Sequence, residues 1–158
     1  MAIYASSGDV PIGKVDMQTT SFTTQLVYGT QGSLMVARRP PGYHSKPHVH
    51  DCEQLNYMQE GELWIFVEKD GYQLKPGDYL RVPPKAIHWS WNRGNVGCTL
   101  VEVHSPGLQS DPIVRDVAVP LFAPYEQQTT TGSPVNEFLP DGQFDAEGVE
   151  ATATQDKA

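Results

Sequence analysis

The sequence predicts an all-β protein, built as a sandwich or barrel of short strands. Three observations support this prediction. Short runs rich in β-branched and aromatic residues recur along the chain, turn-forming residues separate them, and no long segment has the 3.6-residue period of a helix. The 158 residues suffice for one domain with a substantial core. We expect that domain, with an N-terminal β arm, over residues 1–125, and a polar, acidic tail over 126–158.

The first strands are expected to pair as a hairpin. Residues 22–28 and 34–37 are rich in Val, Leu, Phe and Thr, and the connection between them, 29–32, contains two glycines. Pro40, Pro41 and Pro47 follow, and proline removes a backbone donor and restricts the residue before it. The segment that leads to residue 48 is therefore not helical.

Further short strands are predicted downstream, with connectors of turn-forming residues between them. They are expected at residues 62–67, 72–74, 79–82, 87–91 and 99–104. A short helix is expected near 111–117, where Pro112 suits a first turn. The tail is small and acidic toward its end, which we expect to be mobile, whereas Phe138 and Phe144 are apolar enough to dock on the domain.

Composition limits the possible partners and compartments. The net charge of −8 and the lack of a basic run argue against nucleic acid and against an anionic membrane. The N-terminus has no basic start followed by an apolar run, so no signal peptide is indicated. Cys52 and Cys98 are too few for a disulfide framework and indicate reduced thiols in a cytoplasmic protein. Small molecules are the expected partners.

The pair His48 and His50 is the first candidate for chemistry. Side chains two apart on a strand point the same way, so the two rings form half of a metal site, although surface or hydrogen-bonded histidines show the same spacing. Gln54 lies at even spacing from His50 and so has the same parity. His88 supplies a third imidazole from a later strand.

These residues lie in two stretches that resemble the two motifs of the cupin family. The first has a glycine, five residues, HxH, a polar ligand and a glycine; the second has a glycine, five residues, a proline, a histidine and an asparagine. The matching residues are Gly42, His48, His50, Gln54, Gly61, Gly77, Pro83, His88 and Asn92. Two positions depart from the pattern, because Gln54 replaces the usual glutamate and Lys85 a usual glycine. The resemblance implies a cupin jelly roll and a metal.

The amino-acid sequence of residues 48–64 is similar to that of the small cupin cyclases that act in aromatic polyketide biosynthesis. This resemblance implies a metal-dependent aldol condensation that closes an aromatic ring in a poly-β-ketone, either free or bound to an acyl carrier protein. One divalent ion per chain would act as a Lewis acid. A nitrogen-rich ligand set suits zinc, nickel, copper or ferrous iron, and zinc is preferred because the reaction needs no electron transfer.

The fourth ligand is left open between Gln54 and His104. An amide oxygen is a weak ligand for such metals, so Gln54 either binds the ion or hydrogen-bonds to a bound water or substrate in the reaction. Alternation along 99–104 would by itself place Val101 and Val103 inside and leave Glu102 and His104 exposed. The family resemblance implies the reverse, with both side chains facing the metal and His104 as a ligand. In the cyclase, Glu102 or a hydroxide on the metal would then abstract the methylene proton as the general base.

Apolar residues on the same strands complete the candidate site. The expected substrate pocket contains Asn56, Met58, Trp64, Phe66 and Ser90. Trp89 and Trp91 should point away from His88, and a partner subunit or a chain arm should cover them, which motivates a homodimer. Two other functions fit the motifs: a quercetinase-like dioxygenase that uses a redox metal, and a non-catalytic cupin that binds a small ligand.

Overall fold

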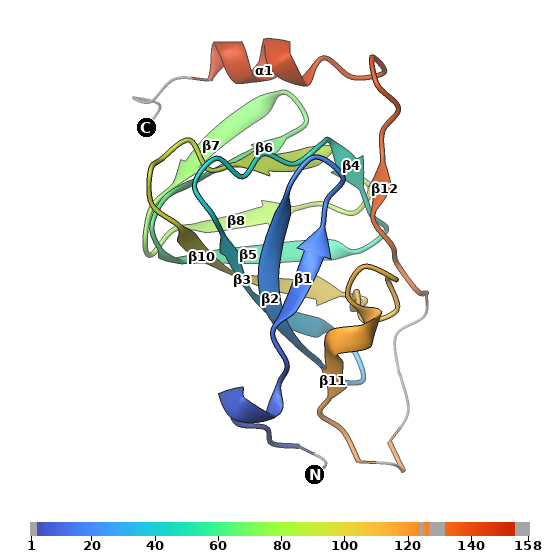
Figure 1. Cartoon of the computed structure of the whole chain (residues 1–158). Helices are drawn as coiled ribbons and strands as arrows, with labels where there is room; N and C mark the ends of the chain where they lie inside the picture. The colour runs from blue at the N-terminus through green and yellow to red at the C-terminus, as the bar shows by residue number, and fades with distance from the viewer. Residues whose placement is uncertain (1–2, 124, 127–131, 154–158) are drawn as a thin grey trace.

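The protein consists of two antiparallel sheets packed face to face, with one short α-helix near the C-terminus (Figure 1). The computed structural model describes residues 3–123, 125–126 and 132–153. The larger, seven-stranded sheet has the order β1-β2-β3-β10-β5-β8, with β11 parallel to β2. The smaller, five-stranded sheet has the order β12-β4-β9-β6-β7. The expected all-β sandwich is therefore confirmed.

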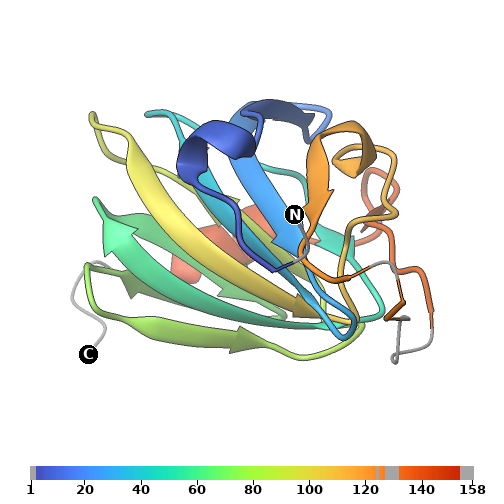
Figure 2. The same ribbon diagram turned by 90° about the horizontal axis from the view of Figure 1, so that it is seen from below.

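The strands of the seven-stranded sheet are β1 (Gly13–Asp16), β2 (Ser21–Tyr28), β3 (Ser33–Arg39), β5 (Glu53–Glu60), β8 (Tyr79–Val82), β10 (Cys98–Ser105) and β11 (Ala118–Pro120). Those of the five-stranded sheet are β4 (His48–Val49), β6 (Leu63–Val67), β7 (Asp70–Leu74), β9 (His88–Trp91) and β12 (Glu137–Phe138). Seen from below in Figure 2, the long strands of the larger sheet run side by side.

The predicted hairpin is present as β2 and β3, which pair from Thr23↔Arg38 to Tyr28↔Ser33. A second tight connection joins β5 to β6 at Gly61, whose φ is 75°. A Cβ there would lie 2.8 Å from the carbonyl oxygen of Gly97. Glycine is therefore required at this turn both by its backbone conformation and by the close approach of the neighbouring chain.

The short helical segment expected near 111–117 is present as turns followed by a 3-10 helix, η2 (Arg115–Val117). The Asp111 carboxylate accepts hydrogen bonds from the backbone N–H of Ile113 and of Asn136, at 3.1 and 2.7 Å. These bonds commit Asp111 to a turn and to a contact with the later chain. A second 3-10 helix, η1 (Ser7–Asp9), lies near the N-terminus.

Strand β10 shows which interpretation of residues 99–104 is correct. Glu102 and His104 are buried, at 4% and 1% exposure, whereas Val103 points outward at 38%. The strand lies between β3 and β5, so its inner face joins the centre of the larger sheet. The orientation implied by the family resemblance is confirmed, and the one expected from simple alternation is wrong, because polar side chains occupy the interior here.

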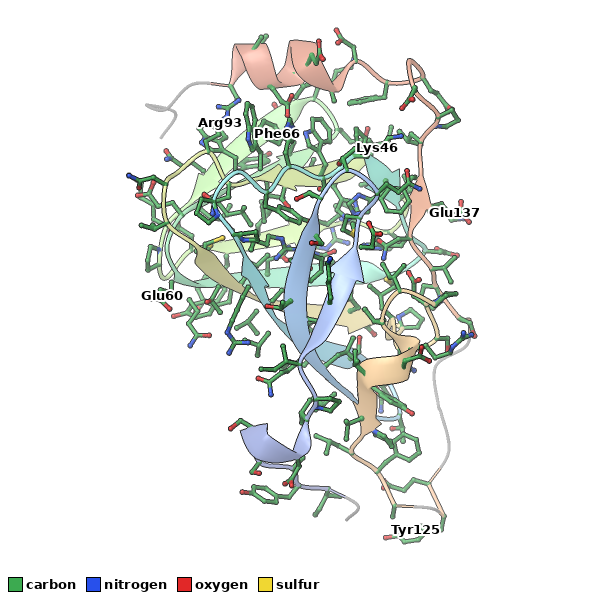
Figure 3. The ribbon with its side chains drawn as sticks, viewed as in Figure 1. Lys46, Glu60, Phe66, Arg93, Tyr125 and Glu137 are labelled. Atoms are coloured by element: carbon green, nitrogen blue, oxygen red, sulfur yellow. The ribbon has the colours of Figure 1, made fainter. Side chains whose placement is uncertain are left out.

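The outer face of the five-stranded sheet carries an aromatic layer that the C-terminal helix covers. Trp64, Phe66 and Trp89 are buried there, with the Phe66 and Trp89 rings stacked at 4.9 Å between centroids. Helix α1 (Ala146–Thr152) packs on this layer together with Phe144, and Figure 3 shows Phe66 and Arg93 beneath the helix. The cover expected for the outward-facing tryptophans is therefore provided by the chain itself.

Polar contacts fix α1 on this layer. The buried Glu150 accepts a hydrogen bond of 3.2 Å from Trp89 Nε1 and pairs with the ring of His44, which also stacks on Trp91. The expected mobility of the chain end stays a prediction, and residues 154–158 lie outside the described residues. No helix in the described ranges is both long and apolar enough to cross a membrane.

Candidate metal centre and cavity

Four buried histidines converge in the interior between the sheets. His48 and His88 are cross-strand partners on β4 and β9, His50 follows β4, and His104 projects inward from β10. Their exposures are between 1% and 6%. Ring centroids lie 4.3 Å apart for His48 and His88, 4.6 Å for His50 and His88, and 5.4 Å for His50 and His104. The two sequence motifs and the last long strand thus supply one cluster.

Backbone carbonyls orient three of these rings. Nδ1 of His48 lies 2.8 Å from the Lys46 carbonyl oxygen, Nδ1 of His88 lies 2.9 Å from that of Ala86, and Nδ1 of His50 lies 3.2 Å from that of Cys52. When Nδ1 carries the proton and donates it to a carbonyl, Nε2 keeps its lone pair. The rings of His48 and His88 are therefore oriented to offer Nε2 to a ligand. Nε2 of His50 lies 3.0 Å from the acceptor Oε1 of Gln54, and Sγ of Cys52 lies 3.2 Å from its Nδ1.

Burial keeps three of these histidines neutral. Desolvation lowers the pKa of His48 to about 4, against the opposing effect of the hydrogen bond to Lys46. Desolvation, followed by the neighbouring histidines, also lowers the pKa of His88 and His104 well below the ordinary value. A metal ligand must be the neutral imidazole, so these three residues are in the required protonation state at neutral pH.

The residues fit a divalent metal ion in chemistry and in spacing. His88 Nε2 and His104 Nδ1 are buried without a hydrogen-bond partner among the described residues. Two imidazoles on one ion, with metal–nitrogen distances of about 2.1 Å, have ring centroids roughly 5 Å apart. Three pairs in the cluster are near this spacing, whereas the centroids of His48 and His50 lie 6.3 Å apart. No group of three or more His, Cys, Asp or Glu in the described ranges is already arranged around a single point, so ligation needs small side-chain rotations.

Gln54 is held beside His50 by its amide group. Its Nε2 donates to Asn56 Oδ1 at 2.7 Å and to Glu102 Oε1 at 3.0 Å. This pair of bonds turns Oε1 toward His50 Nε2, which lies 3.0 Å away. Gln54 is thus positioned either to bind an ion as an oxygen ligand or to accept a hydrogen bond from a molecule beside it.

Glu102 lies at the centre of a buried polar row. Its Oε2 accepts from Arg39 Nη2 at 3.1 Å, and its Oε1 accepts from Gln54. Burial opposes the charge of Arg39, but Glu102 together with Tyr43 and Cys98 outweighs this effect and raises the pKa of Arg39 above its ordinary value. Arg39 therefore keeps its charge, and the oxygens of Glu102 retain lone pairs that can accept a proton.

A cavity of about 40 Å³ adjoins the histidines. A water needs roughly 10–15 Å³ on this scale, so the cavity holds a few waters or a small ligand. The cavity is lined by the histidines, by apolar side chains of the protein core and by residues from later in the chain. Among the other lining residues are Arg39, Glu102, Ile65, Ser90, Ile113 and Asn136.

The expected substrate pocket is only partly correct. Ser90 lines the cavity, Asn56 lies behind Gln54, and Met58 belongs to the apolar core. Trp64 and Phe66 do not line the cavity as expected, because their side chains pack in the aromatic layer under α1. Side chains alternate along β6, so the inward position between them belongs to Ile65.

Sequence reasoning overlooked Arg39, although a signal was available. On β3 the inward positions are Ser33, Met35, Ala37 and Arg39, and continuing this alternation places the arginine inside. Asn136 could not be found in this way, because it reaches the cavity through a long connection. The unusual Lys85 is accounted for by the structure: its φ of 65° is the conformation that favours glycine, and its N–H donates to the His50 carbonyl at 2.9 Å.

The fold and the histidine cluster agree with a comparison with known families. Residues 35–104 match the model of the cupin domain. The resemblance to cupins is therefore confirmed for this segment. The histidines of both motifs and His104, the last residue matched, lie inside it. Cupin domains commonly bind a divalent metal through histidines and are often enzymes.

Two relatives share part of this domain. The chain is 33% identical over 69 residues to an uncharacterised protein of Methanocaldococcus jannaschii, covering 43% of this chain and 55% of that protein. It is 30% identical over 94 residues to the quercetin 2,3-dioxygenase of Bacillus subtilis, covering 58% of this chain and 27% of the enzyme. The chain thus spans about half of the archaeal relative and about a quarter of the dioxygenase.

Solved structures share the fold at low sequence identity. An RmlC-like cupin of Shewanella frigidimarina superposes with a TM-score of 0.58 and 21% identity, over 65% of this chain and 89% of that chain. This likeness supports the cupin sandwich and does not bear on the reaction.

Proposed function

We propose that the protein is a metal-dependent cupin enzyme that oxygenates a small enolisable carbonyl compound. The observation that carries the proposal is the set of four buried imidazoles on the wall of one cavity. The 30% identity to a quercetin 2,3-dioxygenase favours oxygen chemistry over the other reactions known on this fold. A redox-active divalent ion, when bound, would bring O2 and the substrate together and stabilise the charge that develops during the reaction.

The residues of the chain have separate roles in this proposal. His48, His50, His88 and His104 hold the ion. Glu102 accepts the proton that the carbon between two carbonyl groups loses, at an oxygen already fixed by hydrogen bonds. Gln54 places its amide oxygen next to His50 and orients the ligand there. Because the cavity is buried, the charges act in a medium that screens them weakly.

Oxygen consumption tests this proposal. Metal-free protein loaded with ferrous, nickel or cupric ion should take up O2 with a small 1,3-dicarbonyl compound, and zinc-loaded protein should not. The His48→Ala variant should lose the activity, whereas His44→Gln should keep it, since His44 lies outside the cavity and is 40% exposed. Absence of O2 uptake with all three redox metals would refute the oxygenase.

A second candidate is the polyketide cyclase implied by the resemblance of residues 48–64. The neutral, nitrogen-rich site favours it, because a zinc ion with four imidazoles keeps its full charge available to an enolate. A poly-β-ketone chain is much larger than the cavity, so the segments around Ile113 and Asn136 would have to move aside. Coexpression with a minimal polyketide synthase should then change the ring pattern of the products, and His48→Ala should abolish the change.

The third candidate, a non-catalytic cupin that binds a small ligand, follows if neither assay shows turnover. Elemental analysis of the purified protein separates the alternatives at the start. A redox metal supports the oxygenase, and zinc supports the cyclase, the expectation from the sequence. Protein that keeps its ligand affinity after the metal is stripped would support the binding module.

We also propose that the chain forms a homodimer, now through a different surface. Helix α1 covers the tryptophans that motivated the expected dimer interface. We therefore propose the outer face of the seven-stranded sheet as the interface instead. One register row there contains Leu34, Val103 and Leu55, which are 38–48% exposed, and Tyr57 and Tyr79 follow beside it. Large exposed apolar areas of this kind mark interaction sites.

The charges on this face favour a second copy of the chain as the partner. Arg38 and Glu60 both neighbour Thr99 in the register, one on each side of β10. A two-fold axis near Thr99 would bring Arg38 of one protomer toward Glu60 of the other. The face is therefore self-complementary in charge as well as apolar.

A further inference from the structure

We propose that Arg39 and Tyr43 form a carboxylate-binding subsite in the histidine cavity, so that the substrate is a small oxo acid. This inference rests on the proposed function only in placing the substrate in this cavity. It adds a second group of residues that would bind the substrate, on the same cavity wall as the histidines.

The inference starts from buried donors that lack acceptors. Arg39 is only 7% exposed and Tyr43 only 1%. Nε and Nη1 of Arg39 and the hydroxyl of Tyr43 make no hydrogen bond of normal geometry among the described residues, although Tyr43 interacts with Arg39 and with Ser45. Buried polar groups are rarely left unpaired, because each costs about 1–3 kcal/mol in lost hydration. Both residues line the cavity, so a ligand there can supply the acceptors.

The guanidinium group of Arg39 is held in place by aromatic rings and by a carboxylate. Its Cζ lies 4.5 Å from the centroid of the Phe22 ring and 5.2 Å from that of Tyr43. Its Nη2 is anchored by Glu102 at 3.1 Å. A fixed, planar arginine with free N–H groups is the usual partner of a carboxylate, because two donors match its two oxygens.

Charge balance in the cavity also favours an anion. Arg39 and Glu102 are the charged side chains among the described residues that line it, and they cancel each other. Imidazole ligands contribute no charge, so a divalent ion would leave two positive charges in a buried space. A ligand that carries a carboxylate and an enolate supplies two negative charges, one for each end of the site.

The row of contacts connects the two ends. Arg39 bonds to Glu102, Glu102 to Gln54, and Gln54 Oε1 lies 3.0 Å from His50 Nε2. A ligand that lies along this row can therefore meet Arg39 with its carboxylate and the histidine cluster with its keto oxygen. With a cavity of about 40 Å³, the acid must have few heavy atoms.

The test compares two probes of similar size that differ in the carboxylate. Zinc-loaded protein is titrated at pH 7.5 with acetoacetate and with acetylacetone by calorimetry, and the zinc content is checked afterwards. Zinc is chosen because no turnover is expected from it. Acetoacetate should bind at least about tenfold more tightly, as expected for a charge-assisted contact.

Variants assign this preference to the subsite. Tyr43→Phe keeps the ring and should weaken acetoacetate binding severalfold while leaving acetylacetone unchanged. The double variant Arg39→Gln, Glu102→Gln removes both charges together, so it leaves no unpaired charge, and it should abolish the preference. Arg115→Gln is the matched control, since Arg115 is 63% exposed, does not line the cavity and should have no effect.

The outcomes separate this inference from the proposed function. Equal affinity for the two probes in the wild-type protein would overturn the inference, and so would an unchanged preference in both Tyr43→Phe and the double variant. Neither result depends on oxygen. A protein that prefers acetoacetate through Arg39 but consumes no O2 would retain the subsite while the oxygenase proposal fails.

Discussion

Acidification should destabilise the metal-free protein well above the pH at which carboxylates titrate. The perturbation is a change from pH 7.5 to pH 5 after the metal has been removed with a chelator. Burial lowers the pKa of His48 to about 4 and those of His88 and His104 well below their ordinary value. In the unfolded chain these groups titrate near the ordinary value of about 6.5.

The sign and size of the effect follow from this difference. Above pH 6.5 each histidine is neutral in both states, so its effect on the free energy of unfolding is constant. As the pH falls toward 4, the unfolded chain binds protons that the folded protein does not, and unfolding becomes more favourable. For His48 the loss by pH 5 is about 2 kcal/mol, and three such groups approach the total stability of about 5–15 kcal/mol.

Urea denaturation followed by circular dichroism at pH 7.5, 6.5, 5.5 and 5 measures this loss. His48→Asn should reduce the pH dependence by about 2 kcal/mol at pH 5. His44→Gln should leave most of it in place, because His44 lies outside the buried cluster. A free energy of unfolding that is the same at pH 7.5 and pH 5 would show that these histidines are not held neutral, and the account of the site would fail.

Three further predictions concern the metal, the helix and the assembly. His88→Ala should lose most of the metal by elemental analysis, whereas Gln54→Ala should keep it if His104 is the fourth ligand; equal loss in both would make Gln54 the ligand. Glu150→Ala leaves Trp89 Nε1 unpaired and should lower the free energy of unfolding by about 1–3 kcal/mol, and an unchanged urea midpoint would argue against the contact. Light scattering should give a dimer, and a mass near 17.5 kDa would contradict it.

The parts of the fold that the sequence could predict depend on local pattern. Alternating strands, glycine turns and the spacing of His48, His50 and His88 are all local, and each appears in the structure where it was expected. The position of His104 inside the sandwich needed the family resemblance, because alternation alone favours Val103 for the interior. An interior that buries charged residues breaks the rule on which such predictions rest.

Other features could not be read from the sequence because they depend on contacts between distant residues. The Arg39–Glu102 pair joins residues 63 apart, and the Glu150–Trp89 contact joins residues 61 apart. Helix α1 has few apolar residues and forms where Asp145 caps it, by accepting from the Gly148 N–H at 3.0 Å. Its packing on the aromatic layer stabilises a segment whose composition suggested mobility.

The aromatic layer also provides an intrinsic fluorescence probe. The chain has three tryptophans, Trp64, Trp89 and Trp91, and all of them lie on the outer face of the five-stranded sheet. Trp91 also stacks on His44, whose centroid lies 4.2 Å away. Tryptophan emission will therefore report the docking and release of α1 in the unmodified protein. Trp89 also lines the cavity, so ligand binding there is followed independently by calorimetry.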